Sequence, residues 1–77
     1  KKLMPDGSYT TSLFKEGLNK ICAKIAEESG EVIKAVVKES KQRLVSESVD
    51  LIYHLFVACV ARNVTLKDLM AEVVRRK

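Results

Sequence analysis

Two short acidic motifs interrupt the apolar faces of two predicted helices, and they constrain the fold more than any other feature of the sequence. The first is Glu27-Glu28-x-x-Glu31 and the second is Glu47-x-x-Asp50. Residues three positions apart on a helix project from one face, with their Cβ atoms about 5 to 6 Å apart. Glu28 and Glu47 each fall within an apolar stripe, and the members of the two stripes are Ile21, Ile25, Val32 and Val36, and Leu44, Leu51, Leu55 and Ala58. The carboxylates are therefore predicted to point inward.

Inward-facing carboxylates are costly to desolvate, and a hard divalent cation with oxygen ligands is the natural compensation. Because two pairs of carboxylates can converge on one ion, the sequence indicates a metal site with Mg²⁺ as the first candidate. Lys24 and three other lysines lie near the edge of the same helix face and would place phosphate-binding cations beside it: Lys20, Lys34 and Lys38. The alternative is a pair of solvated helix faces with ordinary ion pairs to Lys24, Lys34 or Arg43.

Apolar residues recur at helical spacing along the chain, and no stretch alternates as a strand would, so we expect a single all-α domain over residues 1–77. Residues 1–7 contain Pro5 and Asp6-Gly7 and are predicted to form a loop or entry segment. A short helix of about two turns is expected around Leu13 and Phe14, with Gly17 as its stop. A long amphipathic helix should run from about Asn19 to Glu39.

A second long helix should begin near Lys41 or Arg43 and end near Arg62. It is apolar nearly all round after Asp50, which predicts a central helix buried by more than one neighbour. A last helix should follow Thr65, a good N-cap with Asp68 three residues on. Its inward-facing residues are expected to be Leu66, Leu69, Met70, Val73 and Val74.

The composition predicts a partner subunit. Of the 77 residues 47% are hydrophobic, although only two are Phe, two are Tyr and none is Trp. A chain this short buries only about 60% of its unfolded surface, so we expect a homodimer or higher oligomer to cover the aliphatic excess. The net charge of +4 is spread without an aromatic platform, which favours a phosphate-bearing small molecule over nucleic acid.

No signal peptide is recognisable, and the longest uncharged run, residues 51–61, is too short to span a bilayer about 30 Å thick. Cys22 and Cys59 lie in apolar stretches without metal-ligand spacing, so buried thiols in a reducing cytosol are favoured over a disulfide. His54 is expected to be a satisfied core residue rather than a catalytic one, and a hydrogen bond to Asp50, one turn earlier, would let it orient that carboxylate. Gly30 allows either the close approach of another helix or simple tolerance.

Together the two acidic motifs resemble the signature of the all-α nucleotide pyrophosphohydrolases of the MazG type. Within this group, four features resemble the phosphoribosyl-ATP pyrophosphatase family of histidine biosynthesis: Ser8-Tyr9-Thr10, Gly17, Lys24 and Asp50-Leu51-Ile52-Tyr53-His54. The resemblance extends from Asp6 to about Arg76. Two features depart from the family pattern. Seven residues precede Ser8 where the family often has another helix, and Ser29-Gly30 and Ser48-Val49 replace small apolar residues.

This resemblance implies a cytoplasmic, Mg²⁺-dependent enzyme that hydrolyses phosphoribosyl-ATP to phosphoribosyl-AMP and pyrophosphate, with a MazG-like bundle completed by dimerisation. It implies that Glu28, Glu31, Glu47 and Asp50 are metal ligands and that Glu27 is a supporting carboxylate or the base. Fusion or association with phosphoribosyl-AMP cyclohydrolase is a further expectation. Two alternatives stay open: a general nucleoside triphosphate pyrophosphohydrolase with the same metal site, and a non-enzymatic helical dimerisation module.

Overall fold

The computed structural model describes residues 8–77 and confirms an all-α fold. Its elements are α1 (Ser8–Glu16), α2 (Leu18–Lys38), α3 (Lys41–Ala61) and α4 (Leu66–Arg75), and no strand occurs among the described residues. The predicted entry segment, residues 1–7, lies outside the described residues. The boundary of the second long helix, which the sequence left open, falls at Lys41, because the Ser40 side chain caps the helix by accepting a hydrogen bond from the Arg43 backbone N–H at 3.1 Å.

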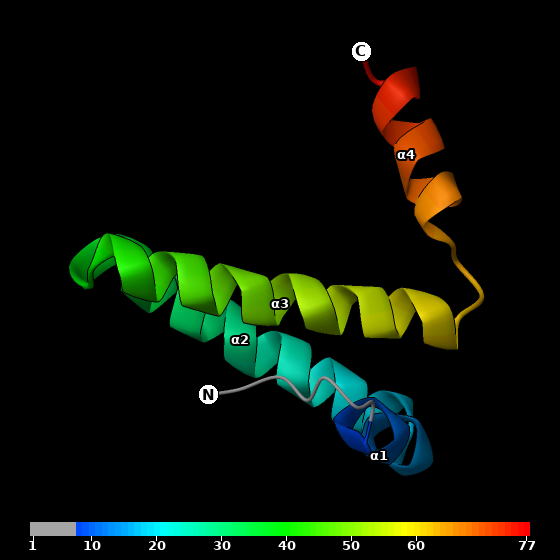
Figure 1. Ribbon diagram of the computed structural model, residues 1–77, viewed down its shortest axis with the longest axis horizontal. Helices are drawn as coiled ribbons and strands as arrows, with labels where there is room; N and C mark the ends of the chain where they lie inside the picture. Colours follow the sequence, from blue (N-terminus) through cyan, green and yellow to red (C-terminus); the bar gives the residue numbers. More distant parts are fainter. Residues whose placement is uncertain (1–7) are drawn as a thin grey trace.

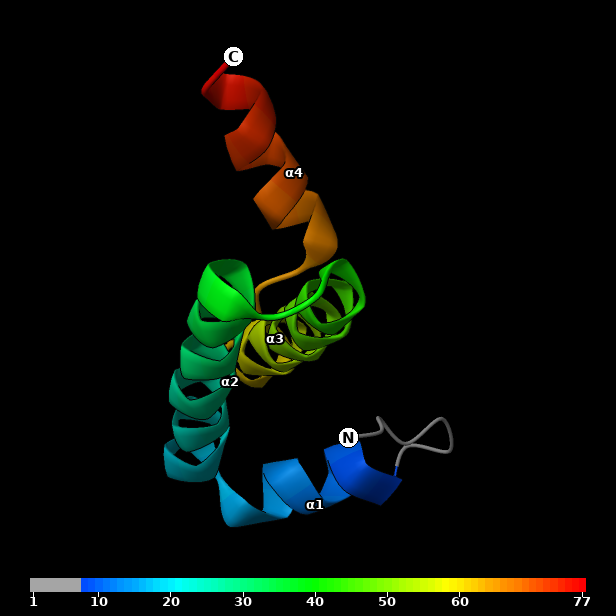
Figure 2. The same cartoon turned by 90° about the vertical axis from the view of Figure 1, so that its left-hand side faces the viewer.

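The two long helices form an antiparallel hairpin. A connection of two residues, Glu39 and Ser40, joins α2 to α3, and the two helices pack side by side at that end (Figure 1). Away from the connection they diverge, and α1 lies across the opening at a steep angle to α2 (Figure 2). A small apolar core of Leu13, Ile21 and Val57 fastens α1, α2 and α3 together there.

Gly17 makes the corner between α1 and α2. Its φ of 88° and ψ of −176° lie in a region of backbone space that is essentially restricted to glycine, and its N–H closes α1 by donating to the Leu13 carbonyl at 3.0 Å. Gly30 differs, since it lies inside α2 with helical backbone. No atom lies within 4 Å of a Cβ built there, so no helix of the described chain approaches it closely.

Replacing the two glycines by alanine should therefore change stability in opposite directions. Gly17→Ala should lower the free energy of unfolding by about 1–3 kcal/mol, through backbone strain alone, since a Cβ at Gly17 would also meet no atom within 4 Å. Gly30→Ala should raise it by up to about 1 kcal/mol, because alanine favours the helix. Urea unfolding followed by circular dichroism checks both, and a Gly17→Ala variant as stable as the wild type would contradict the assigned corner.

The last helix, α4, is capped as predicted, but it does not pack against the hairpin as predicted. Thr65 and Asp68 form a reciprocal capping box, with N–H to oxygen distances of 3.1 Å from Asp68 to Thr65 and 2.9 Å in the opposite direction. However, α4 projects away from the hairpin in both ribbon views (Figures 1 and 2), and none of its residues is buried. The prediction that its apolar residues face inward is therefore wrong for the single chain, in which four of them are 50–68% exposed: Leu66, Met70, Val73 and Val74.

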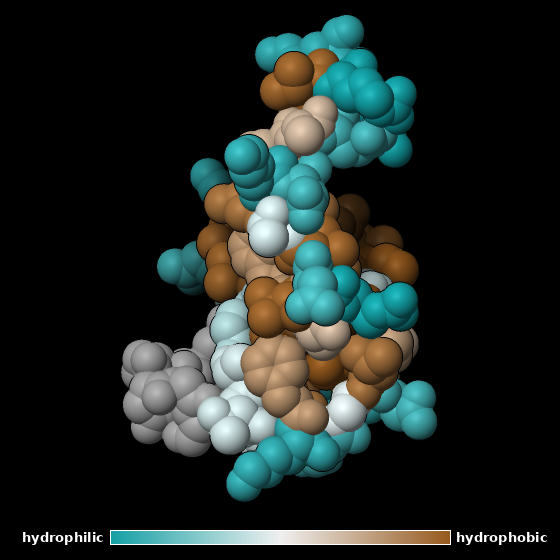
Figure 3. Space-filling model, turned by 90° about the vertical axis from the view of Figure 1, so that its right-hand side faces the viewer, coloured by the Kyte–Doolittle hydropathy of each residue, from teal (hydrophilic) through white to brown (hydrophobic). Residues whose placement is uncertain are grey.

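The prediction that several neighbours bury α3 is also wrong within one chain. Six of its large hydrophobic residues are 43–60% exposed, because α2 covers only one side of the helix: Val45, Val49, Ile52, Leu55, Phe56 and Val60. Figure 3 shows hydrophobic side chains gathered over the C-terminal end of α3, between α4 and α1. Cys22 is likewise exposed rather than buried and Cys59 is half-buried, and both are free thiols.

Among residues 8–77, α3 is long and apolar enough to cross a membrane when length and composition are the only criteria. The uncharged run of the sequence, residues 51–61, is shorter than this helix because it begins only after Asp50. The core helix of a soluble protein meets the same criteria, so the finding is weak evidence for a membrane span. In the structure α3 packs against α2 along the face that carries its buried carboxylates.

Candidate metal centre

The buried residues of the hairpin follow a heptad-like spacing. In α2 they stand seven apart, at Ile21, Glu28 and Ala35, and in α3 they alternate three and four apart. We call these residues the α2–α3 seam, and its α3 members are Glu47, Asp50, His54 and Val57. This spacing keeps one stripe of each helix facing its partner, as the core positions of a coiled coil do. Three carboxylates thus occupy positions where apolar residues would ordinarily pack.

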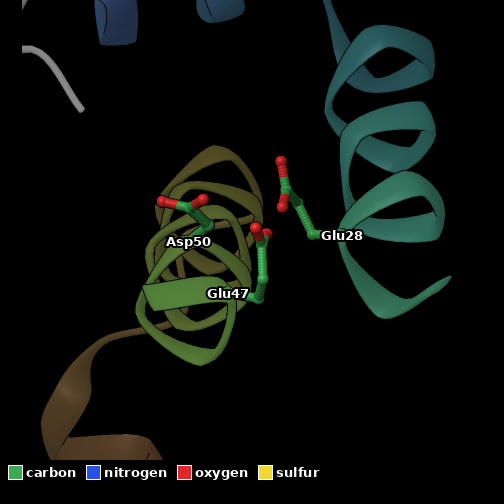
Figure 4. Close-up of side chains that lie close together, drawn as sticks. All are labelled: Glu28, Glu47 and Asp50. Carbon is green, nitrogen blue, oxygen red and sulfur yellow. The ribbon is translucent and has the colours of Figure 1, made fainter. Parts of the chain in front are cut away.

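Glu28 meets Glu47 and Asp50 across the seam. Each residue offers one carboxylate oxygen to a group whose members all lie within 4.8 Å of one another (Figure 4). The exposed fractions are 0% for Glu28, 2% for Glu47 and 4% for Asp50, so the prediction of inward-facing carboxylates is confirmed for all three. Like charges this close in a desolvated site repel, and a cation between them would relieve the repulsion.

The chemistry of the group fits a hard divalent cation. All three ligand atoms are carboxylate oxygens, which Mg²⁺ and Ca²⁺ prefer, and neither soft thiolate nor imidazole belongs to the group. Glu47 Oε1 is buried and accepts no hydrogen bond within the described chain. Since buried polar atoms are nearly always satisfied, an oxygen left in this state within an acidic group is a reasonable ligand position.

The other two predicted carboxylates, Glu31 and Glu27, lie at the margin. Glu31 is half-buried and stands outside the group of three, and Glu27 has a 51% exposed side chain. Lys24, the expected phosphate contact, donates to Glu27 Oε1 at 2.9 Å and lies 3.9 Å from Glu28 Oε2. Its ammonium group therefore links the surface carboxylate to the buried one.

His54 is a satisfied core residue, as predicted. The residue is fully buried, and its Nδ1 lies 2.8 Å from the backbone carbonyl oxygen of Asp50. Because a carbonyl only accepts, Nδ1 must carry the proton and donate it. This bond fixes the ring along the seam next to Tyr53, whose ring it meets edge to face at 5.3 Å.

Arg43, which was predicted only as an ordinary ion-pair partner, contacts the buried site. Its Nη2 lies 2.9 Å from Glu47 Oε2, and it approaches from the first turn of α3, one turn before Glu47. The four-residue spacing was the available signal. Its importance depends on the burial of Glu47, which only the packing of α2 against α3 reveals.

Acidic residues from both helices of an all-α hairpin converge in its seam, which is consistent with the nucleotide pyrophosphohydrolases of the MazG type. The comparison with known families agrees with this class, because the model of the family described as phosphoribosyl-ATP pyrophosphohydrolase matches residues 1–77. The chain belongs to the phosphoribosyl-ATP pyrophosphohydrolase family.

Its relatives include proteins named phosphoribosyl-ATP pyrophosphatase and longer bifunctional proteins. The phosphoribosyl-ATP pyrophosphatase of Sulfolobus acidocaldarius is 48% identical over 97% of this chain and 79% of its own length. The histidine biosynthesis bifunctional protein HisIE of Caldanaerobacter subterraneus subsp. tengcongensis is 47% identical over 99% of this chain, and that of Thermotoga maritima is 44% identical over 100%. The chain spans only 38% and 39% of the length of these two bifunctional relatives.

Proposed function

We propose that the chain hydrolyses phosphoribosyl-ATP to phosphoribosyl-AMP and pyrophosphate, the second step of histidine biosynthesis. The observation that carries this proposal is the buried group of Glu28, Glu47 and Asp50 in a chain of this family. The names of its relatives support the substrate, since several are phosphoribosyl-ATP pyrophosphatases. The reaction breaks the anhydride bond between the α and β phosphates and adds the oxygen of water to phosphorus.

Mg²⁺ is the proposed cofactor, and Glu28, Glu47 and Asp50 would hold it, with Glu31 as a fourth ligand. When bound, the ion would neutralise phosphate charge and make water acidic enough to act as a nucleophile near pH 7. The protein would then supply the proton acceptor. Glu27 has the necessary solvent access and stands next to Glu28 in the chain, so we assign it as the base or as a carboxylate that supports the base.

Lys24 is proposed to steady the phosphates. Its side chain is 19% exposed and its ammonium lies between Glu27 and Glu28, at the boundary between the seam and the solvent. A substrate phosphate arriving beside the metal would meet this positive charge without a rearrangement of either helix. The interaction would favour negatively charged substrates through local attraction.

Pyrophosphate release tests the proposed function directly. The chain should release pyrophosphate from phosphoribosyl-ATP with Mg²⁺ present and release none when the metal is chelated. ATP and deoxynucleoside triphosphates should be assayed beside it under the same conditions. Release mainly from ordinary triphosphates would assign the protein to general nucleotide hydrolysis instead, and no release from any substrate would favour the helical dimerisation module.

We further propose that the active form is a homodimer and that a second copy covers the exposed apolar face of α3 and α4. A groove of about 670 Å³ opens where these helices meet, and six of its eight lining residues are apolar: Phe56, Cys59, Val60, Asn63, Val64, Thr65, Leu66 and Leu69. Exposed hydrophobic residues gathered beside such a groove are typical of an interaction site. A symmetric pair would bury the same face of both copies.

The proposed pathway suggests a cellular location and a partner enzyme. We propose that the protein is cytoplasmic, in keeping with a biosynthetic activity and two free thiols. The bifunctional relatives support fusion or association with phosphoribosyl-AMP cyclohydrolase, which would consume the product. Such an association would pass phosphoribosyl-AMP between two sites of one assembly.

A further inference from the structure

Arg43 connects the buried carboxylate group with the solvent. Its side chain is 55% exposed, whereas that of Glu47, to which it is bonded at 2.9 Å, is only 3% exposed. The guanidinium also lies 3.5 Å from Glu39, measured from Nε to Oε1. Arg43 therefore contacts one carboxylate inside the seam and another, Glu39, that is 24% exposed at the end of α2.

Arg43 and a divalent cation would compete for the same carboxylate. Glu47 contributes an oxygen to the three-carboxylate group, and its Oε2 is engaged by the guanidinium. Two positive species close to one buried carboxylate repel each other, although the exposure of Arg43 to solvent moderates the effect. A metal ion bound at Glu47 would thus weaken the ion pair between Arg43 and Glu47.

We propose that Arg43 is the counter-ion of Glu47 in the metal-free site and that it transfers to Glu39 when a divalent cation binds. The inference rests on the proposed metal site. Glu39 is suited to receive Arg43, since it is already within 4 Å and is better solvated than Glu47. The transfer requires only rotation of a long side chain on the first turn of α3. Arg43 is thus a positioning residue that sets how readily the seam accepts its metal.

Glutamine at position 43 should tighten metal binding. Arg43→Gln leaves the Glu47 carboxylate without its guanidinium, which destabilises the metal-free protein and increases the gain when a cation binds. We expect Mg²⁺ affinity in the absence of substrate to rise about three- to tenfold, a moderate factor because the arginine is partly solvated. Glu39→Gln should act oppositely and weaken Mg²⁺ binding, because Arg43 then loses its alternative partner.

The experiment measures Mg²⁺ affinity by isothermal titration calorimetry and the Mg²⁺-induced rise in melting temperature, both without substrate. Lys41→Gln is the matched control, because Lys41 is exposed on the same first turn and the substitution makes the same charge change. It should leave Mg²⁺ affinity within about twofold of the wild type. Arg43→Lys, which keeps the charge but loses the planar fork, should fall between the wild type and Arg43→Gln.

Equal or weaker Mg²⁺ binding by both Arg43 variants would overturn the inference while leaving the proposed function intact. So would a Glu39→Gln variant that binds Mg²⁺ more tightly than the wild type. If the wild-type protein itself binds no Mg²⁺, the metal site of the proposed function fails and the inference fails with it. Measurement of the wild type first therefore separates the two failures.

Discussion

Asp50→Asn is expected to abolish Mg²⁺-dependent release of pyrophosphate from phosphoribosyl-ATP. The substitution keeps the size and shape of the side chain and removes the negative charge that would bind the metal. We expect kcat/KM to fall by a factor of about a hundred to a thousand or more. Removing a single electrostatic contact to the reacting group typically has an effect of this size. Initial rates at saturating Mg²⁺ give this value.

The same variant should fold normally. Asp50 is buried beside Glu28 and Glu47, and removing one of three neighbouring charges relieves their repulsion. The metal-free variant should therefore melt at the wild-type temperature or above it, whereas the rise in melting temperature on adding Mg²⁺ should disappear. This combination of unchanged folding and lost metal response distinguishes a ligand from a residue needed only for packing.

Glu16→Gln provides the control for Asp50→Asn. Glu16 is exposed near the end of α1, and its replacement makes the same charge change on a surface away from the seam. It should keep full activity and the full Mg²⁺ response. Substantial turnover by Asp50→Asn would refute the assignment of Asp50 as a ligand, even if the family assignment stands.

Phe56→Glu is expected to convert a homodimer into monomers. Phe56 is 45% exposed and lines two adjacent apolar grooves, one at the junction of α3 with α4 and one beside Tyr53 and Thr10. Burying a phenylalanine contributes about 1.5–3 kcal/mol, and a symmetric interface counts each substitution twice. The introduced charge adds a desolvation cost, so the dissociation constant should rise by at least about a hundredfold.

Sedimentation equilibrium measures this change. The wild type should sediment with twice the chain mass of 8.6 kDa and Phe56→Glu with the single mass. Gln42→Glu introduces the same charge at an exposed polar position of the same helix and should remain dimeric. A monomeric wild type at high micromolar concentration would exclude the proposed dimer, and a dimeric Phe56→Glu would place the interface elsewhere.

Local signals in the sequence were sufficient to predict the helices. The stop at Gly17 and the cap at Thr65 each depend on one residue, and the structure places a helix boundary at both. The start of α3, which Ser40 caps, was left open between Lys41 and Arg43. The outer faces of α3 and α4 were mispredicted because an apolar residue indicates burial without indicating what buries it. Among residues 8–77, nothing packs on much of these two faces.

The group of converging carboxylates was only partly predicted, because Glu31 was expected in it and lies outside it. Spacing of three residues places Glu31 on the same general face as Glu28, but roughly 60° around the helix from it. Since α2 buries only a line of residues seven apart, Glu28 enters the seam and Glu31 stays at its edge. The widths of the contacting faces follow from the packing of two helices, which the pattern of either helix alone does not specify.

The seam also limits how stable this chain can become. Glu28, Glu47 and Asp50 occupy core positions of a two-helix contact, where leucine or isoleucine would bury apolar surface without any desolvated charge. Random mutation followed by selection for thermal stability alone would therefore replace these three residues early. The result would be a more stable hairpin without catalytic activity. Protein engineering that aims at robustness should exclude the three positions and seek its gains in the helix caps, at Gly30 and on the solvated faces.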